Sequence, residues 1–259
     1  MNSETTNRAP RFVIARGALH DGFAEVDGAE LHHMRDVTRV APGAEVALLA
    51  ADGLAYWGRL VRYEPGHALI EIRGQADREA SSAILILAPA IIKGPRMDFM
   101  VEKAAELGVA ELWPLVCTRG VVRAPGAERM RRWRRLAFAA AKQSLAARAM
   151  MVGEPLTIAE LGQKVAKETL ALVCAAGAEP FAAMIRSARP RAILIACGPE
   201  GDFDPAEYAA LKAAGFAAAG LGPNRLRSET AALAALSVTI GALYELTGET
   251  KTWLISSPL

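Results

Sequence analysis

The residues best suited to chemistry lie near the C-terminus, in segment 221–232, which is Leu-Gly-Pro-Asn-Arg-Leu-Arg-Ser-Glu-Thr-Ala-Ala. Its Gly-Pro pair predicts a turn, and Ser228 and Thr230 are residue types that often cap the start of a helix. Glu229 stands where a helix dipole stabilises a carboxylate. Ionisable side chains and free backbone N–H groups therefore converge at one helix start, which suits a polar ligand. A helix start that is merely well capped has the same residues, so this segment alone leaves both interpretations open.

A second loop upstream favours a ligand site. Gly-Pro-Glu-Gly at 198–201 follows the apolar run Ala192–Ala196, which is short enough for a buried strand. Asp204 followed by Pro205 then predicts a helix start. The predicted order is strand, loop, helix, short strand over 217–221, loop and helix. Because ligands of open α/β sheets bind beyond the carboxyl ends of the strands, we expect the two loops to form one site.

The sequence disfavours several other classes of site. It contains neither G-x-G-x-x-G nor G-x-x-x-x-G-K-[ST], the loops typical of dinucleotide and nucleoside triphosphate sites. The 3 cysteines lack C-x-x-C spacing, and adjacent His32 and His33 have no partner at metal spacing, so we expect no disulfide and no metal. The longest uncharged stretch, Thr230–Tyr244, is shorter than the roughly 18–20 apolar residues of a spanning helix. The N-terminus lacks the apolar core of a signal peptide, so we expect a cytoplasmic protein without a membrane segment.

Two regions with different patterns are expected on either side of the polar stretch Gly74–Ser82. Before it, short strand-like segments alternate with turn clusters, which is typical of a small β-barrel. These segments are 45–49, 55–61 and 68–72. After it, strands such as Ile84–Leu87 alternate with helices, which is typical of an α/β domain with a parallel sheet. We assign residues 1–78 to the first domain and 82–250 to the second.

The net charge of +2 hides a local concentration of arginine. The segment from Arg119 to Arg135 holds 7 arginines and 1 acidic residue. A helix predicted to begin near Ala127 has an apolar stripe at 3.6-residue spacing, and its arginines lie on the other arc. The stripe comprises Met130, Trp133, Leu136/Ala137, Ala140/Ala141 and Leu145. Guanidinium groups match phosphate geometry, so this face is expected to bind RNA backbone, although solvated basic faces also occur on ordinary helices. The candidate RNA-binding residues here are Arg119, Arg123, Arg131, Arg134 and Lys142.

Both C-terminal loops resemble the paired signature of the ribosomal RNA small subunit methyltransferase E family of the SPOUT superfamily. The similar segments are Gly-Pro-Glu-Gly at 198–201, Leu-Gly-Pro at 221–223 and Leu-Arg-Ser-Glu-Thr-Ala at 226–231. Upstream, segments 93–99, 102–109 and 118–122 resemble parts of the same catalytic domain, and segment 32–43 is similar to the family's small RNA-binding domain. The resemblance covers most of the chain in the right order, and the two C-terminal motifs together are specific.

This resemblance implies a fold, a reaction and partners. Residues 1–78 would form a PUA-like β-barrel that binds RNA, and residues 82–250 a SPOUT α/β domain with a deep trefoil knot that pairs as a homodimer. The implied reaction is S-adenosylmethionine-dependent methylation of N3 of a uridine in 16S ribosomal RNA of the small ribosomal subunit, without a metal. The alternatives are another SPOUT methyltransferase acting on transfer RNA, and a non-catalytic RNA-binding factor of ribosome assembly.

The resemblance also implies roles for individual residues. The N3 of uracil carries a proton at neutral pH, so a base or orienting carboxylate and a charge-stabilising cation are needed. Glu229 and Arg227 are the candidates, with a simple salt bridge between them as the alternative. Arg39 is the candidate RNA ligand of the small domain. The candidate cofactor-binding residues are Gly198, Pro199, Glu200, Gly201, Leu221, Gly222, Pro223, Leu226, Ser228, Thr230 and Ala231.

Three positions depart from the family's pattern. Asp202 stands where Gly-Pro-Glu-Gly-Gly has its last glycine, and aspartate tolerates a positive φ better than most residues, at a cost. Lys142 stands where many members carry glutamate, and Asn224 where arginine is frequent. The cofactor loops themselves are retained, so these differences concern the RNA substrate more than the chemistry.

Overall fold

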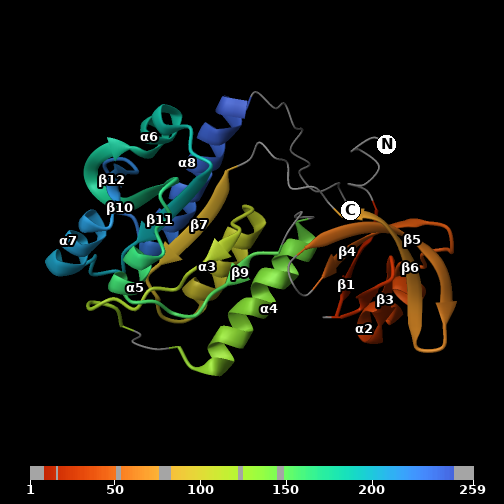
Figure 1. The fold of residues 1–259 in the computed structure, drawn as a ribbon. Helices are drawn as coiled ribbons and strands as arrows, with labels where there is room; N and C mark the ends of the chain where they lie inside the picture. The colour runs from red at the N-terminus through yellow and green to blue at the C-terminus, as the bar shows by residue number, and fades with distance from the viewer. Residues whose placement is uncertain are drawn as a thin grey trace.

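Two sheets lie side by side in the computed structural model, each with its own hydrophobic core (Figure 1). The structure describes residues 9–15, 17–50, 54–75, 83–121, 125–144 and 149–247. The first sheet ends at Gln75 and the second begins at Ile84. Most of the polar stretch predicted to separate two domains therefore lies outside the described residues.

The first sheet has six strands in the order β1-β4-β5-β6-β3-β2. Its elements are β1 (Arg11–Ile14), β2 (Leu19–His20), β3 (Phe23–Asp27), α2 (Gly28–His32), the π-helix η1 (His33–Val37), β4 (Glu45–Ala50), β5 (Ala55–Glu64) and β6 (His67–Gln75). Side chains alternate along each strand, so that Phe12 and Ile14 of β1 both enter the core. The three strands expected from the sequence are confirmed as β4, β5 and β6, and β5 and β6 extend further than predicted.

The second sheet has six parallel strands in the order β12-β10-β11-β7-β8-β9. Its strands are β7 (Ile84–Pro89), β8 (Glu111–Leu112), β9 (Met151–Val152), β10 (Thr169–Pro180), β11 (Ala192–Cys197) and β12 (Ala217–Gly220). Its helices are α3 (Pro95–Glu106), α4 (Ala127–Gln143), α5 (Ile158–Gln163), α6 (Phe181–Ala188), α7 (Pro205–Ala213) and α8 (Ser228–Thr247). The predicted α/β organisation with a parallel sheet is confirmed.

Helices cover both faces of the second sheet. Ile193 and Ile195 of β11 enter a core shared with α3, α4, α6 and α8, whereas Leu194 and Ala196 enter a core shared with α5 and α7. A strand covered on both faces is apolar throughout, which explains the uninterrupted run that predicted β11. The sheet is therefore the middle layer of three, and its strand ends remain free to carry loops.

Local sequence signals set the start of α7 and the orientation of α4. The Asp204 carboxylate accepts a hydrogen bond from the Glu207 backbone N–H at 2.7 Å, and the Glu207 side chain accepts one from the Asp204 N–H at 2.9 Å. In α4, Met130 and Trp133 are buried, as are the other members of the predicted apolar stripe except half-buried Leu136. Leu145, its last predicted member, lies outside the described residues.

The apolar part of helix α8 is longer than the uncharged stretch Thr230–Tyr244. Residues Ser228–Leu246 have a mean hydropathy of 1.2, so α8 is long and apolar enough to cross a membrane by length and composition alone. The core helix of a globular protein has the same composition, and α8 packs against α3, α6, β7 and β11. Leu236 and Thr239 are fully buried in that packing. We therefore treat α8 as a core helix of the second sheet.

Candidate functional site

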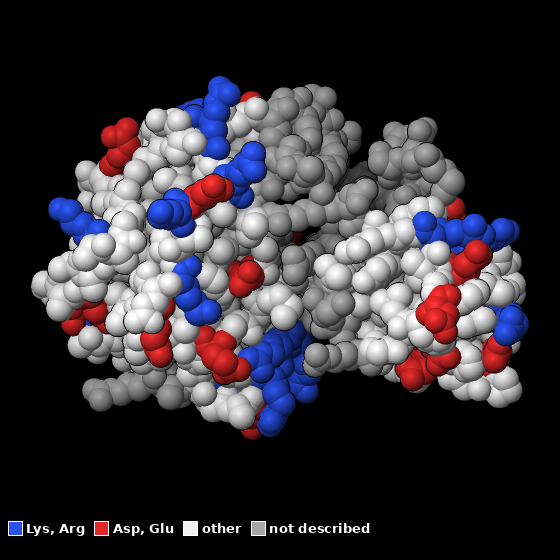
Figure 2. All heavy atoms as spheres, viewed as in Figure 1, with Lys and Arg blue, Asp and Glu red and all other residues white. Residues whose placement is uncertain are grey.

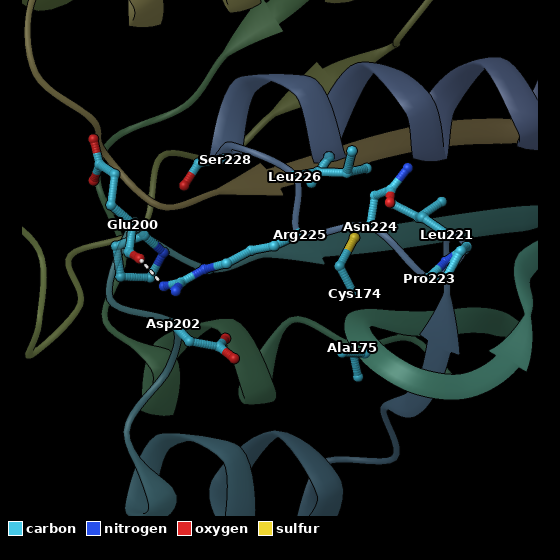
Figure 3. A pocket seen from close by; sticks show the side chains of 15 residues that line it. Cys174, Ala175, Glu200, Asp202, Leu221, Pro223, Asn224, Arg225, Leu226 and Ser228 are labelled. Carbon is cyan, nitrogen blue, oxygen red and sulfur yellow. Dashed lines mark hydrogen bonds between the residues drawn. The ribbon is translucent and has the colours of Figure 1, made fainter.

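A cavity of about 390 Å³ opens at the carboxyl ends of three neighbouring strands, β10, β11 and β12 (Figure 3). The loop after β11 carries Gly-Pro-Glu-Gly, and the loop after β12 carries Leu-Gly-Pro. Because β10 lies between β11 and β12, the bulged part of β10 forms the third side. The two Gly-Pro loops, which the sequence predicts to form one site, thus line the same cavity.

Most of the candidate cofactor residues line the cavity. They are Gly198, Pro199, Glu200, Leu221, Gly222, Pro223, Leu226, Ser228 and Ala231. Gly201 and Thr230 do not line it: the Gly201 carbonyl accepts a hydrogen bond from Arg119 at 3.0 Å, and Thr230 lies on the exposed side of α8. Asp202, Asn224 and Arg225 also line it, within the two predicted loops. A further wall comes from Cys174, Ala175 and Ala176 of β10, which no sequence motif predicts.

The first loop turns tightly around Asp202. Asp202 has a φ of +62°, so the residue that replaces the family's glycine adopts the left-handed conformation expected for that position. Its carboxylate accepts a hydrogen bond from the Phe203 backbone N–H at 2.8 Å, which offsets part of the strain. A Cβ atom at Gly198 would lie 3.0 Å from the Asp202 carboxylate and 3.2 Å from the Phe203 nitrogen. The turn therefore leaves little room for a side chain at position 198.

The second loop approaches the first across the cavity. Figure 3 shows the Arg225 side chain extending toward the first loop, where its guanidinium lies 3.5 Å from the Glu200 carbonyl oxygen. At the start of this loop, a Cβ atom on Gly220 would lie 2.6 Å from the Ala178 carbonyl oxygen. This close approach holds β12 against the bulged part of β10. Both loops are thus fixed by contacts that only small residues permit.

The two candidate catalytic residues lie in different environments at the start of α8. Glu229 is 9% exposed, and one of its carboxylate oxygens, Oε2, is buried without a hydrogen bond among the described residues. The nearest cation is Arg96 of α3, with Nη1 3.7 Å from that oxygen. Arg227 is exposed. The salt bridge considered between Arg227 and Glu229 is therefore not formed, and Arg96 is the partner of Glu229.

Arg96 joins the buried carboxylate to the first loop. Its Nη2 donates a hydrogen bond to Glu200 Oε1 at 2.7 Å, while Nη1 faces Glu229. Glu200 lines the cavity, so a single guanidinium connects a cavity wall with the start of α8. Arg96 lies in segment 93–99, for which the sequence predicts a resemblance but no site residue. The helix itself begins at Ser228, and the Arg227 carbonyl accepts the first helical hydrogen bond, from Ala231, at 2.8 Å.

Two cysteines near the second sheet, Cys117 and Cys197, have raised pKa values. Cys174 and Cys197, on adjacent strands, have their sulfur atoms 3.2 Å apart, and the hydrogen bond between them together with burial raises the pKa of Cys197. Burial raises the pKa of Cys117 to about 12. Cys117 and Cys197 therefore stay protonated at neutral pH, which disfavours thiolate chemistry at these two residues. Within the ranges that the structure describes, no group of three or more His, Cys, Asp or Glu residues is arranged to hold a metal.

Basic side chains gather over α4 on the face shown in Figure 2. Arg131 and Arg135 are exposed and make no hydrogen bond or ion pair with another described residue. Of these two, only Arg131 is a candidate RNA-binding residue. The other candidates on α4 bind within the protein: Lys142 Nζ lies 2.7 Å from both carboxylate oxygens of Glu30, and Arg134 pairs with Glu154. The Lys142 pair joins α4 to the first sheet. Arg123 lies outside the described residues.

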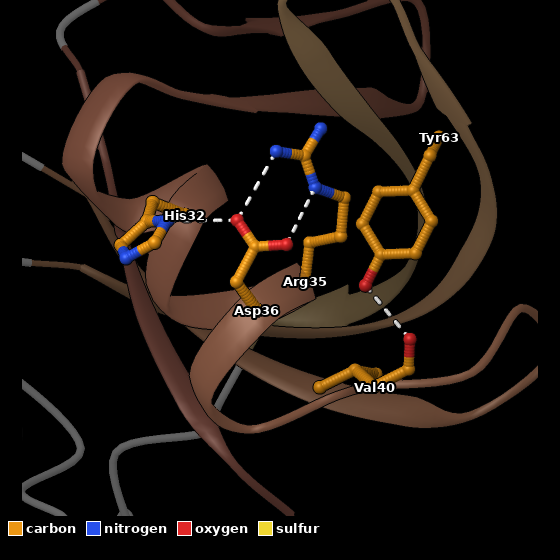
Figure 4. Close-up of polar contacts among 5 residues, drawn as sticks. All are labelled: His32, Arg35, Asp36, Val40 and Tyr63. Carbon is orange, nitrogen blue, oxygen red and sulfur yellow. Dashed lines mark hydrogen bonds and ion pairs between the residues drawn. The ribbon is translucent and has the colours of Figure 1, made fainter.

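Arg39 follows a well-fixed turn of the first sheet. Asp36 accepts hydrogen bonds from His32 at 2.7 Å and from Arg35 Nε at 3.0 Å, and the hydrogen bond from Arg35 lowers the pKa of Asp36 (Figure 4). Tyr63 donates a hydrogen bond to the Val40 carbonyl at 2.7 Å. Arg39 itself has a φ of +54° and an exposed side chain. The turn therefore presents Arg39 to solvent, as an RNA ligand requires.

The chain is similar to known RNA-modifying proteins. A family model described as an RNA methyltransferase domain matches residues 79–240. Ribosomal RNA small subunit methyltransferase E from Synechocystis sp. is 30% identical over 241 residues, which are 92% of this chain and 78% of the relative. The protein of the same name from Mycobacterium bovis is 33% identical over 235 residues, 86% of this chain and 87% of the relative. The fold is also similar to the crystal structure of a ribosomal RNA small subunit methyltransferase E from Neisseria gonorrhoeae bound to S-adenosyl methionine. The TM-score is 0.74 and the sequence identity 31%, and the match covers 92% of this chain and 98% of that chain.

Proposed function

Because the chain belongs to the ribosomal RNA small subunit methyltransferase E family, we propose that it transfers a methyl group from S-adenosylmethionine to N3 of a uridine in 16S ribosomal RNA. The observation that carries this proposal is the single cavity formed by both Gly-Pro loops, with the buried Glu229 carboxylate beside its wall. The substrate would be the RNA of the small ribosomal subunit, and a cytoplasmic location follows from that substrate.

The cavity fits the proposed cofactor in size and chemistry. Its volume of about 390 Å³ falls within the roughly 300–1,000 Å³ typical of small-molecule sites. Leu221 and Leu226 provide apolar walls for an adenosyl group, and the carboxylates of Glu200 and Asp202 provide negative charge for a cationic ligand. When bound, S-adenosylmethionine supplies an electrophilic methyl group on a sulfonium. The protein's main task is then to hold the reacting atoms in line.

Glu229 and the two arginines supply the remaining requirements of the reaction. Oε2 of Glu229, which accepts no hydrogen bond from the described residues, would take the N3 proton of uracil, as base or as orienting group. Arg96 holds this carboxylate in place through its contacts with Glu229 and Glu200. Arg227, which is exposed, would stabilise negative charge on the uracil oxygens. None of these steps needs a metal.

The RNA would bind along α4 and the first sheet. Arg131 is free to contact phosphate, Arg39 stands on a fixed turn, and Arg119 lies beside the first cofactor loop. Lys142 and Arg134 support this surface through their internal pairs, and we assign them a positioning role. Arg123 completes the proposed set.

The finer features of the fold are also proposals. We assign 1–78 to a PUA-like RNA-binding β-barrel and 82–250 to a SPOUT methyltransferase domain with a deep trefoil knot. Support for the barrel comes from β1, which contacts β3 in addition to its pairing partner β4. Support for the SPOUT domain comes from the strand order and from the structural neighbour.

A homodimer through α8 accounts for the exposed face of that helix. Thr230, Ser237, Val238 and Gly241 are exposed although α8 is apolar, and Val238 is 38% exposed. They recur at helical spacing and therefore lie on one side of α8. Small residues on one side allow close approach of a partner helix. The same helix carries Ser228 at the cavity, so the proposed interface adjoins the site.

Nucleoside mass spectrometry of ribosomal RNA tests the function. Deletion of the gene should remove 3-methyluridine from 16S RNA, and the wild type but not Glu229→Ala should restore it. A methylated nucleoside missing from transfer RNA instead would favour a transfer RNA methyltransferase. Calorimetry with S-adenosylmethionine tests the remaining alternative, because a non-catalytic assembly factor that only kept the fold would not bind the cofactor even at millimolar concentration.

A further inference from the structure

A second hollow lies between the two sheets and shares no residue with the cofactor cavity. Its volume is about 600 Å³, and it is bounded by β1 of the first sheet, by α4, and by β9 at the edge of the second sheet. We refer to it as the intersheet groove. Its lining residues include Val13, Phe138, Met150, Met151, Arg135 and Lys142.

The walls of the intersheet groove are apolar and include an aromatic ring. Phe138 is half-buried and packs against a small cluster that contains Leu49 and Ala141, so its position is fixed. Met151 is 46% exposed, which is unusual for so large an apolar side chain. Methionine and aromatic side chains together form adaptable surfaces for flat apolar ligands. The walls therefore suit a planar ring.

The rim of the intersheet groove is basic. Its one acidic residue, Glu30, is already neutralised, because both of its oxygens lie 2.7 Å from Lys142 Nζ. Arg135 is exposed and has no partner among the described residues, and Arg131 stands one turn earlier on the same helix. Figure 2 shows the basic side chains of α4 close to the junction of the two sheets. A ligand that combines a flat ring with negative charge matches this arrangement.

The strand edges of the intersheet groove are closed to a peptide. The Val13 backbone N–H of β1 donates to Glu30 Oε2 at 3.0 Å, and the Val152 carbonyl of β9 accepts from Arg134 Nε at 3.2 Å. A peptide that added a strand would need these same backbone groups. Side chains thus protect both edges and leave only the apolar walls and the basic rim for binding.

We propose that the intersheet groove binds one unpaired nucleobase of the substrate RNA, stacked on Phe138, with a neighbouring phosphate on Arg135. Single-stranded RNA is commonly recognised by bases that leave the stack and pack on aromatic side chains, while the backbone follows basic residues. This inference rests on the proposed function, because it names how that RNA is held at a point away from the reacting uridine.

Fluorescence of 2-aminopurine tests the intersheet groove. The probes are short single-stranded RNAs that span the target uridine, each with 2-aminopurine at one position. One position should lose emission on binding to the wild type, because stacking quenches this base. Phe138→Leu, which keeps the apolar packing, should abolish the quenching and weaken RNA binding by about 5- to 150-fold. Phe138→Tyr, which keeps the aromatic ring, should retain the quenching and the RNA affinity of the wild type.

An abasic RNA provides an independent check. The wild-type protein should bind the RNA without the base at the quenched position more weakly than the intact RNA, by the same factor that Phe138→Leu costs with the intact RNA. The Phe138→Leu protein should bind both RNAs with equal affinity. If the two losses are additive, or if Phe138→Leu binds RNA as tightly as the wild type, the proposal that the intersheet groove binds a nucleobase is wrong, and the methyltransferase proposal is unaffected. Failure of the wild type to bind any RNA, despite normal binding of S-adenosylmethionine, would overturn both proposals.

Discussion

Replacement of Glu229 by glutamine should separate catalysis from stability. Glutamine has nearly the same shape but no charge, so the change removes the proposed proton acceptor and leaves the packing at the start of α8. The structure makes this test sharp because Glu229 does not line the cofactor cavity. Binding of S-adenosylmethionine by Glu229→Gln should therefore stay close to that of the wild type.

The expected loss of stability is small. At the observed 3.7 Å between Arg96 and Glu229, two unit charges attract by about 4 kcal/mol at an effective dielectric constant of about 20. The Arg96 side chain is 38% exposed, and it keeps its 2.7 Å contact with Glu200 after the change. Solvent screening and that remaining partner reduce the net loss in free energy of unfolding to about 1 kcal/mol or less. Loss of a general base, by contrast, lowers the rate by about 100- to 10,000-fold.

The assay combines three measurements on Glu229→Gln and on a control. Methyl transfer to 16S RNA gives the rate, calorimetry gives cofactor affinity, and denaturant unfolding gives stability. Glu245→Gln is the matched control, because Glu245 lies on the same helix in an exposed ion pair with Arg186. The control should behave as the wild type in all three. A Glu229→Gln protein with a normal rate, or one that loses several kcal/mol of stability, would refute the assignment of Glu229 as a catalytic base.

Three further predictions concern RNA, the first loop and acid stability. Arg131→Gln should weaken RNA binding and reduce, by about 0.7, the steepness with which the logarithm of the association constant falls with the logarithm of the salt concentration. Fluorescence anisotropy across potassium chloride concentrations measures this slope, and an unchanged slope would mean that Arg131 contacts no phosphate. Asp202→Gly should unfold at higher denaturant than Asp202→Ala, by about 1 kcal/mol, because both lose the acceptor for Phe203 but only glycine relieves the positive φ. Equal stabilities would show that this turn is not strained. The hydrogen bond from the Glu207 backbone lowers the pKa of Asp204. The ionised Asp204 carboxylate therefore stabilises the fold above the ordinary aspartate pKa of about 4, and this stabilisation is lost as the pH falls below that value. Between pH 5 and pH 3 the melting temperature of the wild type should therefore fall more than that of Asp204→Asn, and parallel curves would contradict the assignment.

The two cofactor loops could be predicted because their signals are local. Gly-Pro turns, the Asp204 cap and the apolar run of β11 each follow from a few consecutive residues. The arrangement of the strands depends on long connections, which short-range patterns do not encode. For this reason the third wall of the cavity, from Cys174 to Ala176, was missed although β10 is itself an apolar strand.

The roles of individual charges were predicted less well than the loops. Lys142 was assigned to RNA from its place on the basic arc of α4, but its partner is Glu30, 112 positions earlier in the sequence. A salt bridge between Arg227 and Glu229 is the alternative that the sequence leaves open to their catalytic roles, but the fold brings Arg96 to that carboxylate instead. Partners of this kind depend on tertiary packing. The apolar stripe that includes Met130 and Trp133 was predicted correctly, because helical periodicity alone determines it.

A homodimer through helix α8 would make cofactor affinity and self-association interdependent. The first turn of α8 supplies Ser228 and Ala231 to the cavity, and the exposed small residues of this helix form the proposed contact between subunits. If the dimer uses that contact, any shift of α8 that tightens one binding event alters the other by the same factor, since coupling free energies are reciprocal. Dilution of the protein would then loosen its hold on the cofactor, and saturation with the cofactor would slow dissociation into monomers.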